Sequence, residues 1–431
     1  MLEYLEVYPC NKPLSGTVKV SGAKNSVLPC LVATLLTAQT CTLRNVPAIS
    51  DIFILVQLLE RFGAVSNLKE DTAEIKVPNV ISTEASYALV KALRASFWVL
   101  APLLARAGAA KVALPGGDAI GARPVDIHLE ALVQMGAEVQ IKSGSVIATA
   151  PNGLHGAELN FRFPSVGATH QILMAAALTP DTTIIHGAAR EPEVVQLCSM
   201  LSQMGAKIHG AGTSDITVVG QKTLGGCDIS IIGDRIEAGT FLLSGAITHG
   251  KVKVEGATKD LFGDAISVFT DMGATLKFGD NFIELDATSG NLSPINISTA
   301  PFPGFPSDLQ PQLMAALTKI PGTSSITETI YEGRFRHASE LSRMGAHIKI
   351  EDRTAFIEGG YPLSGAPVDG LDIRAAVALV MAGLTAQGNT EIYEIHHLRR
   401  GYEKFEQKMK QLGAKLLPRL SEHEEQIFIG C

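Results

Sequence analysis

The sequence predicts an α/β fold of two domains, each built from three copies of one unit, with buried helices inside and short-stranded sheets outside. The first observation is a Gly-Ala pair that recurs six times at intervals of 68 to 73 residues. The second is that an apolar segment and then an amphipathic segment precede each pair. A fixed period indicates a repeated structural unit, and this period is too long for the common solenoids. The pairs stand at 63–64, 136–137, 205–206, 273–274, 345–346 and 413–414.

Each unit is expected to begin with a helix that is buried on all sides. Segments 23–36 (AKNSVLPCLVATLL) and 374–386 (RAAVALVMAGLTA) lack a polar face, which is typical of fully buried helices. A short β-branched strand follows, such as residues 40–46, and then comes the amphipathic helix. The repeated glycine suits the position where a left-handed conformation ends a helix. Two short strands, such as AEVQIK and SVIATA, complete the unit.

Six units divide into two domains of three. We expect residues 23–232 to form a domain inserted into a discontinuous one of residues 1–22 plus 233–431. The opening segment 5–20 resembles strands that could close the last unit. The inserted domain contains loop 115–124, whose glycines favour mobility and close approach of the backbone to a ligand. Because this loop precedes a helix, it resembles a lid.

The composition favours a globular protein of the cytoplasm. The net charge is −7 and 46% of the residues are hydrophobic, so nothing draws the chain to nucleic acid or to an anionic membrane. The apolar stretches fall short of the ~20 residues that a membrane-spanning helix needs. The acidic start argues against export. Six scattered cysteines without a CxxC pair or metal spacing fit a reducing compartment.

Polar and charged residues are concentrated where helices are expected to begin. Helix N-termini carry free N–H groups and about half a positive charge, so several facing one another would bind phosphates and carboxylates. Asp51, Asp234 and Asp308 could each be no more than a cap. Basic residues, however, are disfavoured at these ends, and their recurrence favours an anionic ligand. The residues are Lys24, Asn25, Arg94, Ser165, Asp234, Arg235, Asp308, Asp372 and Arg374, with Arg123, Asp126, Arg190, Glu191, Glu193, Arg334, Arg399 and Arg400 before the second helices.

Most of these residues fall within ten short strings, which are SGAKN (21–25), RAS (94–96), GARPVD (121–126), PSVGAT (164–169), AREPE (189–193), DRIEAGTFL (234–242), FPSD (305–308), ELSRMGA (340–346), DIRA (372–375) and RGYE (400–403). On these strings the sequence resembles, over essentially the whole chain, the UDP-N-acetylglucosamine enolpyruvyl transferases of the EPSP synthase family, which open peptidoglycan synthesis. That resemblance implies a two-domain inside-out α/β barrel and neither metal nor organic cofactor. A monomer is expected.

The resemblance implies two substrates, phosphoenolpyruvate and UDP-N-acetylglucosamine, and a role for each matching residue. Lys24, Arg123 and Arg400 would hold the phosphate and carboxylate of phosphoenolpyruvate. Asn25 would contact both substrates, and Asp308 would be the base near the sugar 3-hydroxyl. Addition of the hydroxyl and elimination of phosphate need an acid, a base and cations of this kind. The UDP moiety would contact Arg123, Pro124, Val125, Asp126, Ser165, Val166 and Gly167, and the cleft would be lined by Arg94, Asp234, Ile330, Arg334, Asp372 and Arg374.

The chain departs from the family's pattern at Asp118, where the family has a lid cysteine that protonates C3 and is alkylated by fosfomycin. An aspartic acid can donate a proton if desolvation raises its pKa, so we expect Asp118 to act as the acid. A carboxylate is a poorer nucleophile than a thiolate, so we also expect insensitivity to fosfomycin. Phe163 stands where some members have a lysine near the nucleotide, and Arg162 could compensate.

Three alternative functions can be weighed against the sequence. A shikimate-pathway enolpyruvyl transferase would carry Gly-Ser-Lys-Ser at 22–25, where this chain has Gly-Ala-Lys-Asn. A non-catalytic paralogue that binds UDP-sugars could have lost the cysteine at position 118. A ring around DNA would need a basic inner face, whereas the helices that would line it are apolar. The pair His396-His397 favours a surface or core position over a metal site.

Overall fold

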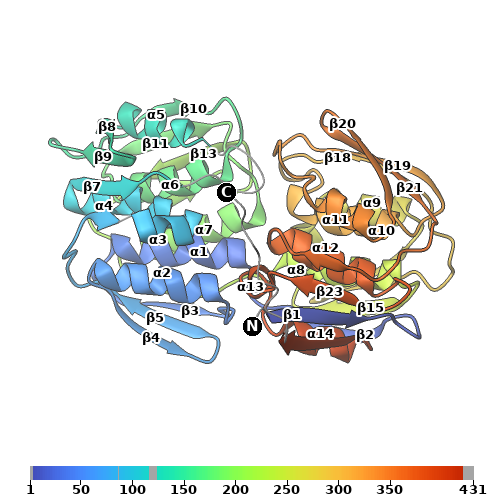
Figure 1. The fold of residues 1–431 in the computed structure, drawn as a ribbon. Helices are drawn as coiled ribbons and strands as arrows, with labels where there is room; N and C mark the ends of the chain where they lie inside the picture. The colour runs from blue at the N-terminus through green and yellow to red at the C-terminus, as the bar shows by residue number, and fades with distance from the viewer. Residues whose placement is uncertain (1–2, 86, 116–123, 421–431) are drawn as a thin grey trace, which may run out of the picture.

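The computed structural model describes residues 3–85, 87–115 and 124–420, which form two α/β domains side by side (Figure 1). In these ranges the strands form six four-stranded sheets. One hydrophobic core draws on residues from Val27 to Ile231, and the other draws on residues 5–20 together with residues from Ile236 to Leu416. The helices that were predicted to be buried in each unit have mostly buried side chains. The predicted fold class is therefore confirmed.

The first three units follow one another along the chain. Unit one contains α1 (Lys24–Ala33), η1 (Thr34–Leu36), β3 (Cys41–Arg44), α2 (Ser50–Arg61), β4 (Val65–Lys69) and β5 (Thr72–Lys76). Unit two contains β6 (Glu84–Ala85), α3 (Tyr87–Ala92), η2 (Arg94–Val99), α4 (Leu100–Ala107), β7 (Ala109–Ala113), α5 (Asp126–Gln134), β8 (Glu138–Lys142) and β9 (Ser145–Thr149). Unit three contains β10 (Glu158–Asn160), α6 (Val166–Ala177), β11 (Thr182–His186), α7 (Pro192–Gln203), β12 (Lys207–His209) and β13 (Asp215–Val219), and β14 (Cys227–Ser230) follows.

The other three units have a similar order of helices and strands, and β1 (Glu3–Tyr8) and β2 (Ser15–Lys19) precede all six units. Unit four contains α8 (Arg235–Ile247), β15 (Lys251–Glu255), η3 (Lys259–Leu261), α9 (Ala265–Asp271), β16 (Thr275–Gly279) and β17 (Phe282–Asp286). Unit five contains β18 (Asn296–Ser298), η4 (Ser307–Leu309), α10 (Gln310–Leu317), β19 (Gly322–Thr327), α11 (His337–Arg343), β20 (His347–Glu351) and β21 (Thr354–Gly359). Unit six contains β22 (Pro367–Asp369), α12 (Ile373–Gly383), β23 (Thr390–Tyr393), α13 (His396–Arg399), α14 (Phe405–Gln411) and β24 (Lys415–Leu420).

In every sheet, a strand that precedes a buried helix pairs in parallel with a strand that follows one. Within unit three, for example, β10 and β11 are parallel on either side of α6. In two of the sheets, the two parallel strands come from different units, because the units exchange strands. β2 precedes α1 but pairs with β15, which follows α8, whereas β14 precedes α8 but pairs with β3, which follows α1. The chain therefore crosses between the two sheet systems twice, once before each of these helices.

The two crossing segments, residues 20–23 and 231–234, bind each other. Gly22 and Gly233 form an antiparallel bridge. The N–H of Ala23 donates to the carbonyl of Ile232 at 2.8 Å, and the N–H of Asp234 donates to the carbonyl of Ser21 at 2.9 Å. The backbone of Asn45 also lies close to Gly22, since a Cβ on Gly22 would lie 1.8 Å from the carbonyl oxygen of Asn45. Only glycine fits at such a distance.

The start of the chain belongs with its end. β1 lies between β23 and β24 and pairs antiparallel with both, and the dark blue β1 and β2 lie among the yellow to red elements in Figure 1. β1 thus completes the sheet of unit six, whereas β2 joins unit four. We propose domain boundaries of 23–232 and 1–22 plus 233–431.

Two of the buried helices begin with a 3₁₀ turn. Residues 94–107 divide into η2 and α4, and the start of unit five divides into η4 and α10. Pro102 and Pro311 lack the N–H that would continue an α-helix backwards, and their rings clash with the preceding turn. In the first turn of a helix the missing N–H costs nothing. Arg94 and Asp308 consequently lie on the 3₁₀ turns, ahead of the buried helices.

No helix in the described ranges has the length and apolarity that crossing a bilayer requires.

The crossover makes a prediction about stability. Gly22→Ala should lower the free energy of unfolding by at least about 1–3 kcal/mol, because the added methyl group meets backbone that cannot move without breaking the strand exchange. Gly225→Ala is the matched control, since its Cβ would lie 3.5 Å from the nearest atom, the carbonyl oxygen of Met204. Urea unfolding followed by circular dichroism measures both variants. Equal stability of the two variants would contradict the interpretation.

Candidate active site

The predicted site residues meet where the crossing segments enter α1 and α8. Lys24 is the first residue of α1, and its backbone N–H donates to Asp234 Oδ2 at 3.0 Å. Asp234 also caps α8, because its Oδ1 accepts from the N–H groups of Ile236 and Glu237 at 2.8 and 3.0 Å. One carboxylate thus ties the first turns of two helices from different domains.

A buried aspartate joins two of the predicted cations. Asp51 lies in the first turn of α2 with a fully buried side chain, and its Oδ2 is 2.7 Å from Lys24 Nζ. Its Oδ1 accepts from Arg400 Nε at 2.8 Å. Burial lowers the pKa of Lys24, and Asp51 opposes this change. Arg400 follows α13, so these three side chains span the two domains. Two cations around one carboxylate leave a net positive charge, which suits an anion.

Asp308 is the centre of a second charged group. Its Oδ1 accepts from Arg334 Nη2 at 2.8 Å and its Oδ2 from Arg374 Nη2 at 3.0 Å. The two arginine side chains are 3% and 5% exposed, whereas Asp308 is 30% exposed. Desolvation acts to lower the pKa of Arg374, but Asp308 and Tyr402 together raise it above its usual value. Asn25 Nδ2 donates to Asp308 Oδ2 at 3.4 Å, so this group also spans the two domains.

The structure separates the residues that cap helices from the aspartates that bind cationic side chains. Asp372 caps α12 by accepting from the N–H of Arg374 at 2.7 Å, and Ser165 caps α6 by accepting from the N–H of Ala168 at 3.3 Å. The carboxylates of Asp51 and Asp308 are instead engaged by cationic side chains. The possibility that those two were only caps is wrong.

The residues predicted to bind the nucleotide surround the first turns of α5 and α6. These turns approach closely, since a Cβ on Gly167 would lie 3.1 Å from His128 Cε1. Asp118 and Arg123 lie outside the described residues. The described ones are Pro124, Val125 and Asp126 at the start of α5, and Ser165, Val166 and Gly167 at the start of α6.

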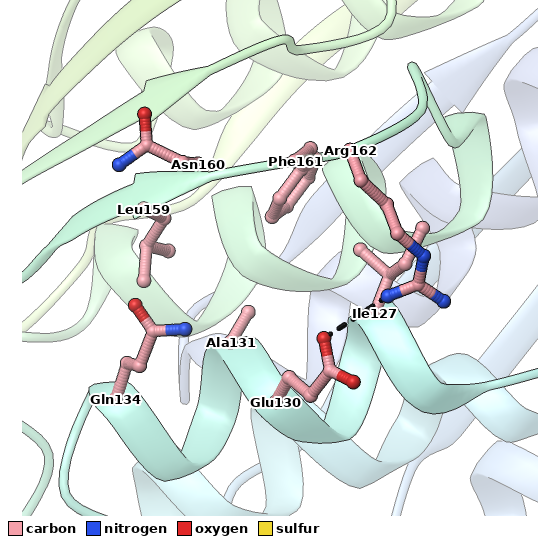
Figure 2. A pocket seen from close by; sticks show the side chains of 8 residues that line it. All are labelled: Ile127, Glu130, Ala131, Gln134, Leu159, Asn160, Phe161 and Arg162. Carbon is pink, nitrogen blue, oxygen red and sulfur yellow. Dashed lines mark hydrogen bonds and ion pairs between the residues drawn. The ribbon is translucent and has the colours of Figure 1, made fainter.

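Arg162 lies beside this region. Its guanidinium forms ion pairs with Asp126 and, at 3.1 Å, with Glu130. Figure 2 shows Arg162 and Glu130 at one end of a cavity of about 120 Å³ between α5 and the β10 segment. Phe163 is 41% exposed. Arg162 therefore contacts Asp126, which was predicted to bind the nucleotide, whereas the side chain of Phe163 carries no charge.

Glu328 was not anticipated, although it fixes two predicted site residues. This side chain is buried, and it accepts from Ser307 Oγ at 2.9 Å and from the N–H of Ile330 at 2.8 Å. Ser307 directly precedes Asp308, so Glu328 orients the η4 turn. A glutamate in a loop after a strand carries no local pattern that would single it out. Arg94 begins η2, as its position before a buried helix predicted.

A further pair connects the domains near α7. Arg235 Nε lies 2.9 Å from Glu193 Oε1, with side chains 8% and 4% exposed. Burial would lower the pKa of Arg235, but Glu193 raises it. Glu191 accepts from the N–H of Phe302 at 3.2 Å, and burial raises the pKa of Glu191. Arg235, Glu191 and Glu193, which the sequence pattern placed among the residues favouring an anionic ligand, thus form contacts between the two domains.

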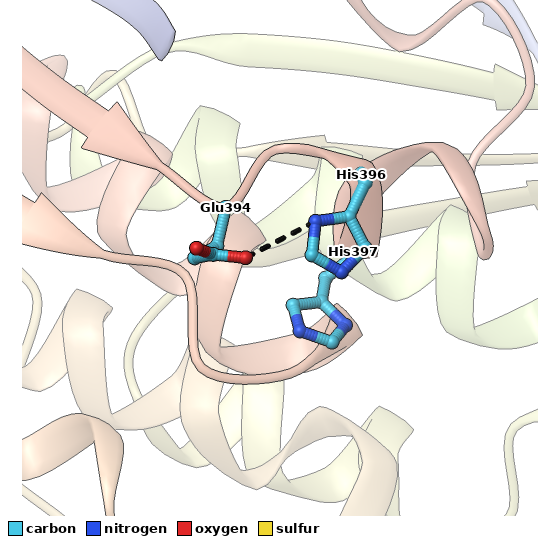
Figure 3. Close-up of side chains that lie close together, drawn as sticks. All are labelled: Glu394, His396 and His397. Atoms are coloured by element: carbon cyan, nitrogen blue, oxygen red, sulfur yellow. Dashed lines mark ion pairs between the residues drawn. The ribbon is translucent and has the colours of Figure 1, made fainter. Parts of the chain in front are cut away.

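The histidine pair has an unexpected neighbour. Glu394, His396 and His397 bring ligand atoms within 4.8 Å of one another, and Figure 3 shows His396 paired with Glu394. The His396 Nδ1 to Glu394 Oε2 distance is 3.2 Å, with side chains 62% and 51% exposed. An exposed ion pair of this kind forms without any metal. We assign the group no role in the site.

Comparison with known proteins adds the family. Residues 10–409 match EPSP synthase (3-phosphoshikimate 1-carboxyvinyltransferase). UDP-N-acetylglucosamine 1-carboxyvinyltransferase 2 of Carboxydothermus hydrogenoformans is 48% identical over 404 residues, which cover 94% of this chain and 96% of that protein. The UDP-N-acetylglucosamine 1-carboxyvinyltransferase of Beijerinckia indica subsp. indica is 46% identical over 420 residues, covering 95% and 97%.

Solved structures agree on the fold. The enolpyruvyl transferase NikO from Streptomyces tendae has a TM-score of 0.87 at 24% identity, covering 97% of this chain and 99% of that one. An EPSP synthase from Acinetobacter baumannii has a TM-score of 0.77 at 19% identity, covering 97% and 100%.

The buried carboxylate allows a second test of stability. Asp51→Asn should lower the free energy of unfolding by about 3 kcal/mol, because Lys24 and Arg400 lose their shared counter-ion in a buried place. Asp228→Asn is the matched control, since Asp228 pairs with Arg44 at 2.7 Å but both side chains are more than half exposed. Its loss should stay within about 1 kcal/mol. Calorimetry at neutral pH compares them, and equal losses would show that burial of Asp51 does not matter.

Proposed function

Since the chain belongs to the UDP-N-acetylglucosamine 1-carboxyvinyltransferases of the EPSP synthase family, we propose that it transfers the enolpyruvyl group of phosphoenolpyruvate to the 3-hydroxyl of UDP-N-acetylglucosamine. Phosphate is the second product. The observation that carries the proposal is the pair of charged groups that span the domains, one centred on Asp51 and one on Asp308. This transfer is the first committed step of peptidoglycan synthesis, and we propose that the protein performs it in the cytoplasm as a monomer.

The Asp51 group supports binding of phosphoenolpyruvate. Lys24 and Arg400 supply two positive charges against one carboxylate, so an incoming phosphate or carboxylate can share them without leaving the protein charges unbalanced. Arg123 is proposed to add a third cation. Cations placed in this way also stabilise the phosphate as it departs.

The Asp308 group supports base catalysis. Asp308 is the exposed member of its group, so its carboxylate is accessible to a sugar hydroxyl, while Arg334 and Arg374 fix its orientation. In the addition, Asp308 takes the hydroxyl proton as the oxygen bonds to C2, and Asp118 delivers a proton to C3. In the elimination, the carboxylate that Asp118 has become takes a proton back from C3, the double bond re-forms, and the C2–O bond breaks with departure of phosphate. Asn25, from the other domain, is proposed to contact both substrates.

The start of α5 and α6 supports binding of the nucleotide. Two helix N-termini lie close together here, which favours an anion, and Arg162, which pairs with Asp126 and Glu130, lies beside them. We propose that Arg123, Pro124, Val125, Asp126, Ser165, Val166 and Gly167 bind the UDP moiety, and that Arg94, Asp234, Ile330, Arg334, Asp372 and Arg374 line the site.

The activity is tested by phosphate release on mixing the protein with phosphoenolpyruvate and UDP-N-acetylglucosamine. Asp308→Asn should lower kcat by about 10²–10⁴-fold, the range for loss of a general base, with folding unchanged by circular dichroism. Asp228→Asn, a remote surface change, should retain full activity. Release with shikimate 3-phosphate instead of the UDP-sugar would favour EPSP synthase activity. Binding of UDP-sugar without any release would favour a non-catalytic paralogue.

Fosfomycin tests the proposed acid. The wild type should keep its activity after incubation with fosfomycin, because a carboxylate attacks the epoxide poorly. Asp118→Cys should remain active and become subject to time-dependent inactivation, with mass spectrometry finding one adduct at position 118. Inactivation of the wild type through Asp118 would contradict the assignment. Asp118→Asn, which cannot supply a proton, should lose activity.

A further inference from the structure

A largely buried polar cluster lies next to the crossover. Lys408 Nζ, on α14, donates to Ser21 Oγ at 2.7 Å and to Glu237 Oε1 at 2.5 Å. Ser21 Oγ donates to Glu403 Oε2 at 2.7 Å, and the N–H of Ser21 donates to Glu237 Oε2 at 2.8 Å. The side chains of Lys408 and Glu237 are 12% and 3% exposed. A lysine held so deeply exchanges water for these few partners.

The members of this cluster adjoin both cations of the Asp51 group. Ser21 precedes Lys24 by three residues, and its carbonyl accepts from the N–H of Asp234 at 2.9 Å. Glu237 lies in the first turn of α8, the helix that Asp234 caps. Asp234 in turn accepts from the backbone N–H of Lys24. Lys408 is therefore connected to the start of α1 by two routes.

A third route leads to Arg400. Glu403 follows Arg400 by three residues, and its bond from Ser21 Oγ fixes the end of this turn. Tyr402 anchors the middle, because it is buried and its hydroxyl lies 3.0 Å from Thr240 Oγ1. The turn that presents Arg400 and the segment that presents Lys24 are thus bound to each other through Ser21.

The charges of the cluster depend on Lys408. Burial raises the pKa of Glu237 to about 7, and Lys408 opposes this rise. Without the ammonium group, Glu237 would hold a proton, and its hydrogen bond from the Ser21 N–H would weaken. Substitution of Lys408 should therefore loosen the crossing segment even though Lys408 belongs to a different helix.

We infer that Lys408 is a positioning residue, which holds the segments carrying Lys24 and Arg400 in register so that both cations reach phosphoenolpyruvate together; this inference rests on the proposed function. Lys408 touches neither substrate in this arrangement and acts through Ser21, Glu237 and Glu403. The effect should be selective. The nucleotide residues on α5 and α6 are anchored by other contacts, so binding of the UDP-sugar should not depend on Lys408.

The test compares steady-state kinetics of the full-length wild type, Lys408→Met and Lys408→Arg. Lys408→Met should lower kcat/KM for phosphoenolpyruvate by about 10–100-fold, the scale for small misplacement of a binding group, while KM for UDP-N-acetylglucosamine stays within about twofold of the wild type. Lys408→Arg, which keeps the charge, should recover most of the loss. Lys404→Met is the matched control, because Lys404 is 65% exposed and lies 3.8 Å from Glu403.

Ser21→Ala provides a milder variant if Lys408→Met fails to fold. It removes the hydroxyl that Lys408 and Glu403 share but keeps the backbone bonds, and it should lower kcat/KM for phosphoenolpyruvate in the same direction. Equal loss for both substrates, or no loss in an intact Ser21→Ala, would overturn the positioning role. An inactive wild type would instead refute the proposed function, and the inference with it.

Discussion

The structure depends on one constraint, the antiparallel crossing of residues 20–23 and 231–234. Each segment leaves a sheet in one domain and starts a buried helix in the other, so β2 and β14 exchange their parallel partners. Gly22 and Gly233 allow the backbones to touch. Because the crossing delivers Lys24 and Asp234 side by side, the geometry of the candidate site is set by the same contacts that join the domains. Fold and site cannot be altered independently here.

Charge follows from this arrangement. Two carboxylates, Asp51 and Asp308, each accept from two cationic side chains, and each group draws on both domains. A buried ion pair repays its desolvation only with good geometry and several bonds, which is the condition met here. The Asp51 group has more positive than negative charge, so the proposed anionic substrates would meet a local cationic site on a chain whose net charge is −7.

The repeat and the apolar helices could be predicted from the sequence because both are local patterns with a fixed period. The strand exchange could not, since β2 and β15 are separated by more than 230 residues and nothing in their composition specifies a partner. Asp51 matched the pattern of a helix cap, and its pairing depends on Arg400 from the far end of the chain. Glu328 carried no local signal at all. Position relative to a helix end predicts a polar role but not which partner satisfies it.

The proline breaks illustrate how local chemistry and site placement combine. A 3₁₀ turn before α10 advances Asp308 beyond the buried helix, so its carboxylate is 30% exposed while its arginine partners stay buried. The same displacement brings Asp308 within reach of Asn25, which lies one residue from Lys24. Asp308, the candidate base, is therefore bonded to Asn25, and Lys24, the candidate phosphate ligand, is the residue before Asn25 in α1. A movement of α1 relative to α10 would thus change both charged groups at once.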